Sequence, residues 1–230
     1  MILKAEAVTK KYFRKSADKN YFYAVNETDF TLEGGKLTEI IGRSGSGKTT
    51  FLNMLAGLLS PSSGKVLLDG EDIYSLNDKK LSALRNQKIG VVPQGQTGLD
   101  SLTVLENVKL PYILYSKNDD ADEKAKELLE KVGIADLADS YPKELSGGEV
   151  RRLAIARALM NSPEVILADE PTGDLDDENT EIVLKLLRKT ADDGAAVLIV
   201  THEAEAKQYA DSLYRMNTGK LVQVEGVKLA

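Results

Sequence analysis

Cysteine and tryptophan are absent from the 230 residues of this sequence, and histidine occurs once, as His202. Without cysteine the chain can form no disulfide framework, no thiolate nucleophile and no cysteine-ligated zinc site. A single histidine also excludes a metal site built from several histidines. The composition therefore suits a reducing compartment.

Long apolar runs are also missing. The longest is Ala195–Val200, whereas a membrane-spanning helix needs about 20 residues. The N-terminal segment has lysines on both sides of a few apolar residues, unlike a signal peptide. The net charge of −6 argues against a general nucleic-acid binder. With 42% hydrophobic and 29% charged residues, we expect a soluble, cytoplasmic, globular chain of one or two domains.

The hydrophobic pattern predicts strands alternating with helices at both ends of the chain and a largely helical middle at 99–159. We expect strands at 5–8, 30–32, 37–41, 65–68, 165–168 and 196–201, helices at 51–59, 123–132, 149–159 and 177–191, and a hairpin at 217–219. This order predicts an α/β fold with a mostly parallel sheet and an inserted helical segment.

A glycine-rich loop follows the strand predicted at 37–41. Residues 42–49 match the pattern G-x-x-x-x-G-K-[ST] in full, between a predicted strand and a predicted helix. Such a loop turns several backbone N–H groups toward phosphate oxygens at the positive end of a helix. The lysine would reach the β and γ phosphates, and the hydroxyl after it would ligate Mg²⁺. The predicted phosphate-site residues are Gly42, Ser44, Gly45, Ser46, Gly47, Lys48, Thr49 and Thr50.

A second apolar strand ends in two acids, Asp169 and Glu170. Alone, this pattern is explained equally well by a strand that meets an exposed turn. Together with the phosphate loop it predicts a nucleoside triphosphate site, in which Asp169 serves the metal and Glu170 orients a water against the γ-phosphate.

Residues 145–149 read Leu-Ser-Gly-Gly-Glu at the start of a predicted helix. Ser146, Gly147 and Gly148 could form a second anion site from a hydroxyl and backbone N–H groups, and the alternative is a plain helix N-cap. The segment resembles the signature, usually LSGGQ, of the ATP-binding cassette (ABC) ATPases.

The resemblance extends over almost the whole chain, in the family's order and spacing. Tyr12 resembles the aromatic residue that stacks on adenine, although other aromatic residues lie nearby. Gln94 matches the glutamine lid contact of the family, and Asp176 belongs to a match to the D-loop. His202 matches the switch histidine that contacts the γ-phosphate; a structural histidine is the alternative.

The resemblance implies one nucleotide-binding domain over residues 1–230, with a P-loop NTPase fold. A RecA-like lobe with a mostly parallel sheet and N-terminal antiparallel strands would span about 1–94 and 161–230, and an inserted α-helical lobe about 95–160. It implies a head-to-tail homodimer holding two ATP molecules. The implied metal contacts are Thr49, Gln94 and Asp169, and the implied catalytic residues are Glu170, His202, Gln94 and Lys48.

A narrower resemblance, to the macrolide-exporter, lipoprotein-release and antimicrobial-peptide-resistance group, rests on residues 85–90, 105–111 and 167–173. It implies a polytopic membrane permease partner, no direct nucleic-acid contact, and a peripheral position on the inner face of the cell membrane. The alternatives are a soluble cassette ATPase acting on nucleic acid or ribosomes, and a nucleotide-dependent clamp without transport. The chain departs from the group at Glu149, at 95–98 and in a long loop at 14–22.

Overall fold

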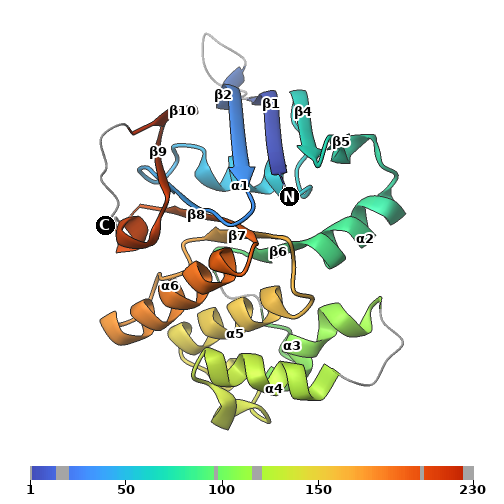
Figure 1. The fold of residues 1–230 in the computed structure, drawn as a ribbon, viewed down its shortest axis with the longest axis vertical. Helices are drawn as coiled ribbons and strands as arrows, with labels where there is room; N and C mark the ends of the chain where they lie inside the picture. Colours follow the sequence, from blue (N-terminus) through green and yellow to red (C-terminus); the bar gives the residue numbers. More distant parts are fainter. Residues whose placement is uncertain (1, 14–20, 96–97, 116–120, 203–204, 225–230) are drawn as a thin grey trace.

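The computed structural model describes residues 2–13, 21–95, 98–115, 121–202 and 205–224. The departures expected at 14–22 and 95–98 therefore lie mostly outside the described residues. Figure 1 shows β1, β2 and β4 toward one end of the long axis, β6, β7 and β8 across the middle, and the helices α3, α4 and α5 toward the other end. Among the described residues, no helix is both long and apolar enough to cross a membrane.

The N-terminal part forms an antiparallel sheet in the order β2-β1-β4-β5. Its strands are β1 (Ile2–Phe13), β2 (Tyr21–Glu33), β4 (Ser63–Leu68) and β5 (Glu71–Asp72). Alternate residues such as Leu3 and Ala5 face the core and are fully buried, as expected for a sheet with one covered face. The predicted strands in this part are confirmed, but they are longer than the apolar runs that marked them.

The larger sheet has the order β10-β9-β3-β8-β7-β6. Only β10 is antiparallel to its neighbour. The strands are β3 (Leu37–Ile41), β6 (Ile89–Val92), β7 (Val165–Asp169), β8 (Ala196–Thr201), β9 (Ser212–Asn217) and β10 (Lys220–Gln223). Ile41 pairs with Thr201 and Asp169 with Val200, so the carboxyl ends of β3, β7 and β8 meet at one edge. Open α/β sheets bind ligands at this edge.

The helices are α1 (Lys48–Leu55), α2 (Asp78–Lys88), α3 (Val104–Ile113), α4 (Ala121–Lys131), α5 (Gly147–Leu159) and α6 (Asp177–Asp192). Short 3-10 turns cover Ile73–Ser75, Ala135–Leu137, Pro142–Glu144 and Glu205–Tyr209. The expected helix at 51–59 was wrong in its bounds, because Gly57 adopts φ +69° and the chain turns there. The hydrophobic pattern did not predict α2, because none of its residues is fully buried and only Leu81 and Leu84 pack, partly buried, against the core.

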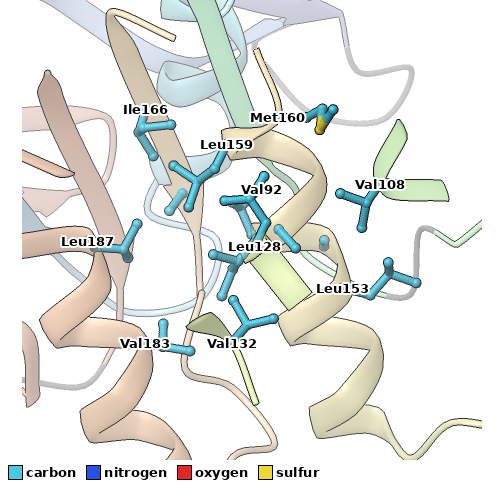
Figure 2. Packing of buried hydrophobic residues seen from close by; sticks show 14 of the residues in the cluster. Val92, Val108, Leu128, Val132, Leu153, Leu159, Met160, Ile166, Val183 and Leu187 are labelled. Atoms are coloured by element: carbon cyan, nitrogen blue, oxygen red, sulfur yellow. The ribbon is translucent and has the colours of Figure 1, made fainter. Parts of the chain in front are cut away.

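Two hydrophobic clusters cover the faces of the larger sheet. One joins the sheet to α1 and the N-terminal sheet. The other joins it to α3, α4, α5 and α6. Figure 2 shows part of this second cluster, in which Val92 and Ile166 of the sheet lie among Leu128 of α4, Leu153 of α5 and Leu187 of α6. The helical insertion thus packs continuously against the sheet, and the lobe boundaries stay a prediction.

The side chain of Asn107 on α3 forms hydrogen bonds to the backbone just before this helix. Its side chain is fully buried. The amide oxygen accepts from Leu99 N at 2.8 Å, and the amide nitrogen donates to the carbonyls of Leu99, Leu102 and Thr103 at 3.1, 3.1 and 2.9 Å.

Replacing Asn107 with leucine should destabilise the protein by about 2–4 kcal/mol, because buried backbone groups lose their partners. Urea unfolding measures the loss. Asn179→Leu removes an asparagine that is bonded to Asp176 on an exposed helix end, and should change stability far less. Equal losses in both variants would contradict the assignment.

Candidate nucleotide site

The phosphate loop lies between β3 and α1, as the motif predicts. Two of its glycines are required by close packing. A Cβ on Gly42 would collide with the carbonyl oxygen of Met216, and one on Gly47, which has φ +109°, would collide with that of Ala24. At Gly45, φ is +76° and no atom of the described residues lies within 4 Å of an added Cβ. The loop therefore holds a curled backbone with open space over Gly45.

Lys48 starts α1 and is almost fully buried, with 6% exposure. Its ammonium donates to Gly42 O at 2.7 Å and to Arg43 O at 3.4 Å, and it lies 3.9 Å from Oε1 of Glu170. The cation is thus held over the loop by neutral carbonyls, with one carboxylate close by. A phosphate would provide it with a stronger partner.

A cavity of about 1580 Å³ opens above the loop. The β1 and β2 strands contribute Tyr12, Phe13, Phe22 and Tyr23 to its wall. The predicted residues that the cavity brings together are Tyr12, Gly42, Ser44, Gly45, Ser46, Gly47, Lys48, Thr49, Thr50, Gln94, Glu170 and His202. An aromatic wall thus faces the same space as the phosphate loop.

Glu170 is held at the carboxyl edge of the sheet in a left-handed backbone conformation, φ +50°. Its Oε2 accepts from Thr201 Oγ1 at 2.9 Å, from the His202 backbone N–H at 3.3 Å, and lies 2.9 Å from His202 Nδ1. Non-glycine residues in this region store strain, which is common at functional sites. The carboxylate is therefore fixed by Thr201, the last residue of β8, and by His202, which follows the strand.

Asp169 is the innermost acid of the site, with 2% exposure. Burial raises the pKa of its carboxyl, opposed by a hydrogen bond from the Thr49 hydroxyl. Its Oδ1 is buried and has no hydrogen-bond partner among the described residues. An orphaned carboxylate oxygen beside a hydroxyl fits Mg²⁺, which takes a few oxygen ligands from protein and completes its shell with phosphates and water.

The remaining predicted nucleotide residues lie outside this cavity. Ser146 is the N-cap of α5: its hydroxyl accepts from Glu149 N at 3.3 Å, and its own N–H donates to Glu149 Oε2 at 2.7 Å. That bond lowers the pKa of the Glu149 carboxyl. Asp176 is the N-cap of α6 and accepts from Asn179 N at 2.8 Å. Within one chain the N-cap role of Ser146 is confirmed, and Gly147 and Gly148 pack near 174–175.

Sequence reasoning missed two residues that shape the site. Thr201 binds Glu170, and its signal was only its place at the end of a buried strand. Arg151 is almost fully buried, with 6% exposure. Its guanidinium donates to Pro93 O at 2.9 Å, next to Gln94. It links the helix that begins at the signature to the segment that carries the predicted glutamine.

Comparisons with known proteins agree with this geometry. The family model described as "ABC transporter" matches residues 25–173. An uncharacterized ABC transporter ATP-binding protein of Thermotoga maritima is 43% identical over 88% of this chain and 87% of its own length. The lipoprotein-releasing system ATP-binding protein LolD of Shewanella denitrificans is 40% identical over 97% and 96%.

Solved structures of ABC transporter cassettes also resemble this chain. The dimeric structure of MJ0796, a bacterial ABC transporter cassette, superposes with a TM-score of 0.89 at 35% identity, covering 97% of this chain and 99% of that one. A post-hydrolysis state of the same cassette, bound to ADP and Pi, superposes equally well at 34% identity. The chain therefore belongs to the ABC transporter family, as one of its ATP-binding, ATP-hydrolysing subunits.

Proposed function

We propose that two copies of this chain bind two ATP molecules head to tail, each between the phosphate loop of one copy and Ser146–Gly148 of the other. The observation that carries the proposal is the separation of the two residue groups within one chain: the signature and Asp176 lie outside the cavity that holds Lys48. Two copies would bring both groups to one nucleotide. The dimeric state named for the MJ0796 cassette supports this arrangement.

In this proposal the predicted site residues have distinct roles toward ATP. Tyr12 would stack on adenine, the loop N–H groups and Lys48 would hold the phosphates, and Thr49, Asp169 and Gln94 would hold Mg²⁺. When bound, the ion neutralises charge on the β and γ phosphates.

Hydrolysis would begin at Glu170. The carboxylate would take a proton from water, whose oxygen attacks the γ phosphorus as the bond to the bridging β–γ oxygen breaks and ADP leaves. Thr201 and His202 hold the carboxylate in place, and the exposed His202 ring, which lines the cavity, would contact the γ-phosphate. Gln94 lines the same cavity.

Ser146→Arg tests the two-chain site. The bulky cation should abolish ATP-dependent dimers and lower turnover about 100-fold, while a single chain still binds ATP through its own cavity. Gel filtration with ATP, equilibrium binding and phosphate release measure the three quantities. Ser101→Arg, at another exposed position of the helical region, is the control. Loss of ATP binding by the isolated Ser146→Arg chain, or unchanged turnover, would contradict the two-chain site.

Tyr12→Ala tests the adenine role. We expect ATP binding to weaken about tenfold or more, because a base–aromatic stack is lost, and Tyr12→Phe to retain most of the affinity. Tyr141→Ala removes a similarly exposed tyrosine of the helical region and should not affect binding. If Tyr12→Ala binds ATP normally, another aromatic residue of the wall holds the base.

We further propose a polytopic membrane permease of the export or mechanotransmission type as partner, with this chain peripheral on the inner membrane face. The relatives named as lipoprotein-releasing ATP-binding proteins support this proposal. So do the apolar side chains Ile113, Leu114 and Tyr115, exposed by 54, 63 and 48% at the end of α3.

Copurification from detergent-solubilised membranes tests the partner. The tagged chain should retain a stoichiometric polytopic protein, and Leu114→Asp should release it. Val222→Asp, at a position exposed by the same 63% on β10, should not. Recovery of ribosomes or nucleic acid in place of a membrane protein would favour the soluble alternative.

A further inference from the structure

A second cavity, of about 780 Å³, lies away from the nucleotide site. It is lined by α4, the end of α5 with the turn after it, α6, and the turn at 193–195. None of its lining residues lines the nucleotide cavity. Figure 1 shows α4, α5 and α6 together on the side of the larger sheet opposite to β1 and β2. Its volume is that of a small-molecule site, roughly 300–1,000 Å³.

The floor of this cavity is apolar. Leu128 of α4, Leu159 of α5 and Leu186 of α6 line it, together with Pro163 and Ile182. Figure 2 shows Leu128 and Leu159 entering the hydrophobic cluster that includes Leu187. The floor is thus a continuation of the core that reaches the surface, and it can accept an alkyl chain.

Four lysines line the rim of this cavity, and three of them form ion pairs with carboxylates. Lys131 pairs with Glu127 at 2.7 Å, and Lys189 with Asp193 at 3.1 Å. Lys185 pairs with Glu181, one turn earlier on α6, at 2.7 Å. The third acid of the lining, Glu164, pairs with Lys88 at 3.4 Å.

Lys124 differs from these lysines. Its ammonium donates to the hydroxyl of Ser162 at 2.9 Å, and among the described residues no carboxylate lies within 4.0 Å of it. Burial lowers the pKa of this lysine, opposed by the more distant Glu127. A partly desolvated cation whose partner is a neutral hydroxyl favours an anionic ligand.

Ser162 is held in place for this contact. It adopts φ +46°, a left-handed conformation that is uncommon for serine, and its N–H donates to Leu159 O at 2.9 Å at the end of α5. The strained turn places its hydroxyl at the mouth of the cavity beside Lys124. A polar pair at one end and an apolar floor at the other match an amphipathic anion.

We propose that this cavity binds an amphipathic monocarboxylate, such as a medium-chain fatty acid anion. The carboxylate would contact Lys124 and Ser162, and the alkyl chain would lie on Leu128, Leu159 and Leu186. The ligand would then bridge α4 and α6. The inference does not depend on the nucleotide site or on the partner proposed above.

Calorimetric titration of the full chain with dodecanoate, below its micelle concentration, tests the site. We expect one dodecanoate per chain, and Lys124→Ala to weaken binding about tenfold. Lys124→Arg should retain it. Lys189→Ala removes a lysine of the same rim that is already paired with Asp193, and should leave binding unchanged. Leu186→Asn should also weaken binding, with circular dichroism to verify the fold.

Three results would overturn the proposal. Dodecanol or dodecyltrimethylammonium binding as tightly as dodecanoate would show an apolar groove without anion recognition. Equal losses in Lys124→Ala and Lys189→Ala would show a general charge effect. Displacement of dodecanoate by saturating ATP, together with insensitivity to Lys124→Ala, would place the ligand in the nucleotide cavity.

Discussion

Glu170→Gln should lower ATP turnover by about 100- to 1,000-fold, because the amide cannot accept the proton of the attacking water. ATP binding should persist, since Lys48 and the loop N–H groups are untouched. The uncleaved nucleotide should then hold the two chains together, so that a dimer accumulates with ATP. Phosphate release and gel filtration measure these effects in one preparation.

A variant that only weakens the hydrogen bonding of Glu170 should have a smaller effect on turnover. Thr201→Val removes the hydroxyl that donates to Oε2 at 2.9 Å but leaves the carboxylate present. We expect a smaller loss, about tenfold, in turnover with little change in ATP affinity. Glu164→Gln, which alters a half-exposed acid paired with Lys88, is the control.

Turnover at the wild-type rate in Glu170→Gln would contradict the catalytic role of Glu170.

Glu39→Gln should stabilise the protein in a pH-dependent way. Glu39 lies on β3, between β8 and β9 at the centre of the larger sheet, and is fully buried. Neither of its carboxylate oxygens has a hydrogen-bond partner among the described residues. Burial raises the pKa of the carboxyl to about 7 from 4.5, with Lys207 opposing the shift. Near neutral pH the folded protein therefore binds a proton that the unfolded chain releases.

The sign of the pH dependence follows from this difference. Since the folded pKa is the higher one, the stabilisation is complete below pH 4.5 and is lost as the pH rises through about 7. Above that range, the cost of a buried carboxylate is about 3 kcal/mol. The uncharged amide of Glu39→Gln avoids this cost, so the variant should be more stable by about 2–3 kcal/mol at pH 8 and similar at pH 5.

Urea unfolding at pH 5, 6, 7 and 8 measures this dependence. The difference between wild type and Glu39→Gln should grow with pH and level off above 7. Glu33→Gln, at an exposed position at the end of β2, should follow the wild type at every pH. A constant difference between Glu39→Gln and wild type would show that burial of charge is not the cause.

Several parts of the site were predictable because each depends on a short stretch of chain. Residues 42–49 must be contiguous to curl a backbone around phosphate, so their types and spacing specify the loop. The same holds for the buried β7 ending in Asp169 and for the N-cap position of Ser146. Here local backbone geometry restricts the residue types directly.

Other features depend on strands far apart in the chain. Thr201 and His202 meet Glu170 because β7 and β8 pair in parallel with Asp169 opposite Val200. Phe22 stacks on Tyr12, with ring centroids 5.8 Å apart, because β1 and β2 pair in that register. No local pattern encodes these registers.

The lack of cysteine and the single histidine excluded disulfides, thiolate nucleophiles and metal sites built from cysteines or several histidines. The motifs determined the family and the nucleotide. Only the tertiary structure decided which residues share the cavity, that Glu39 is buried without partners, and that Lys124 stands over an apolar floor. The physical reason is that burial and desolvation are properties of the assembled layers. A residue acquires them from neighbours that the sequence places anywhere along the chain.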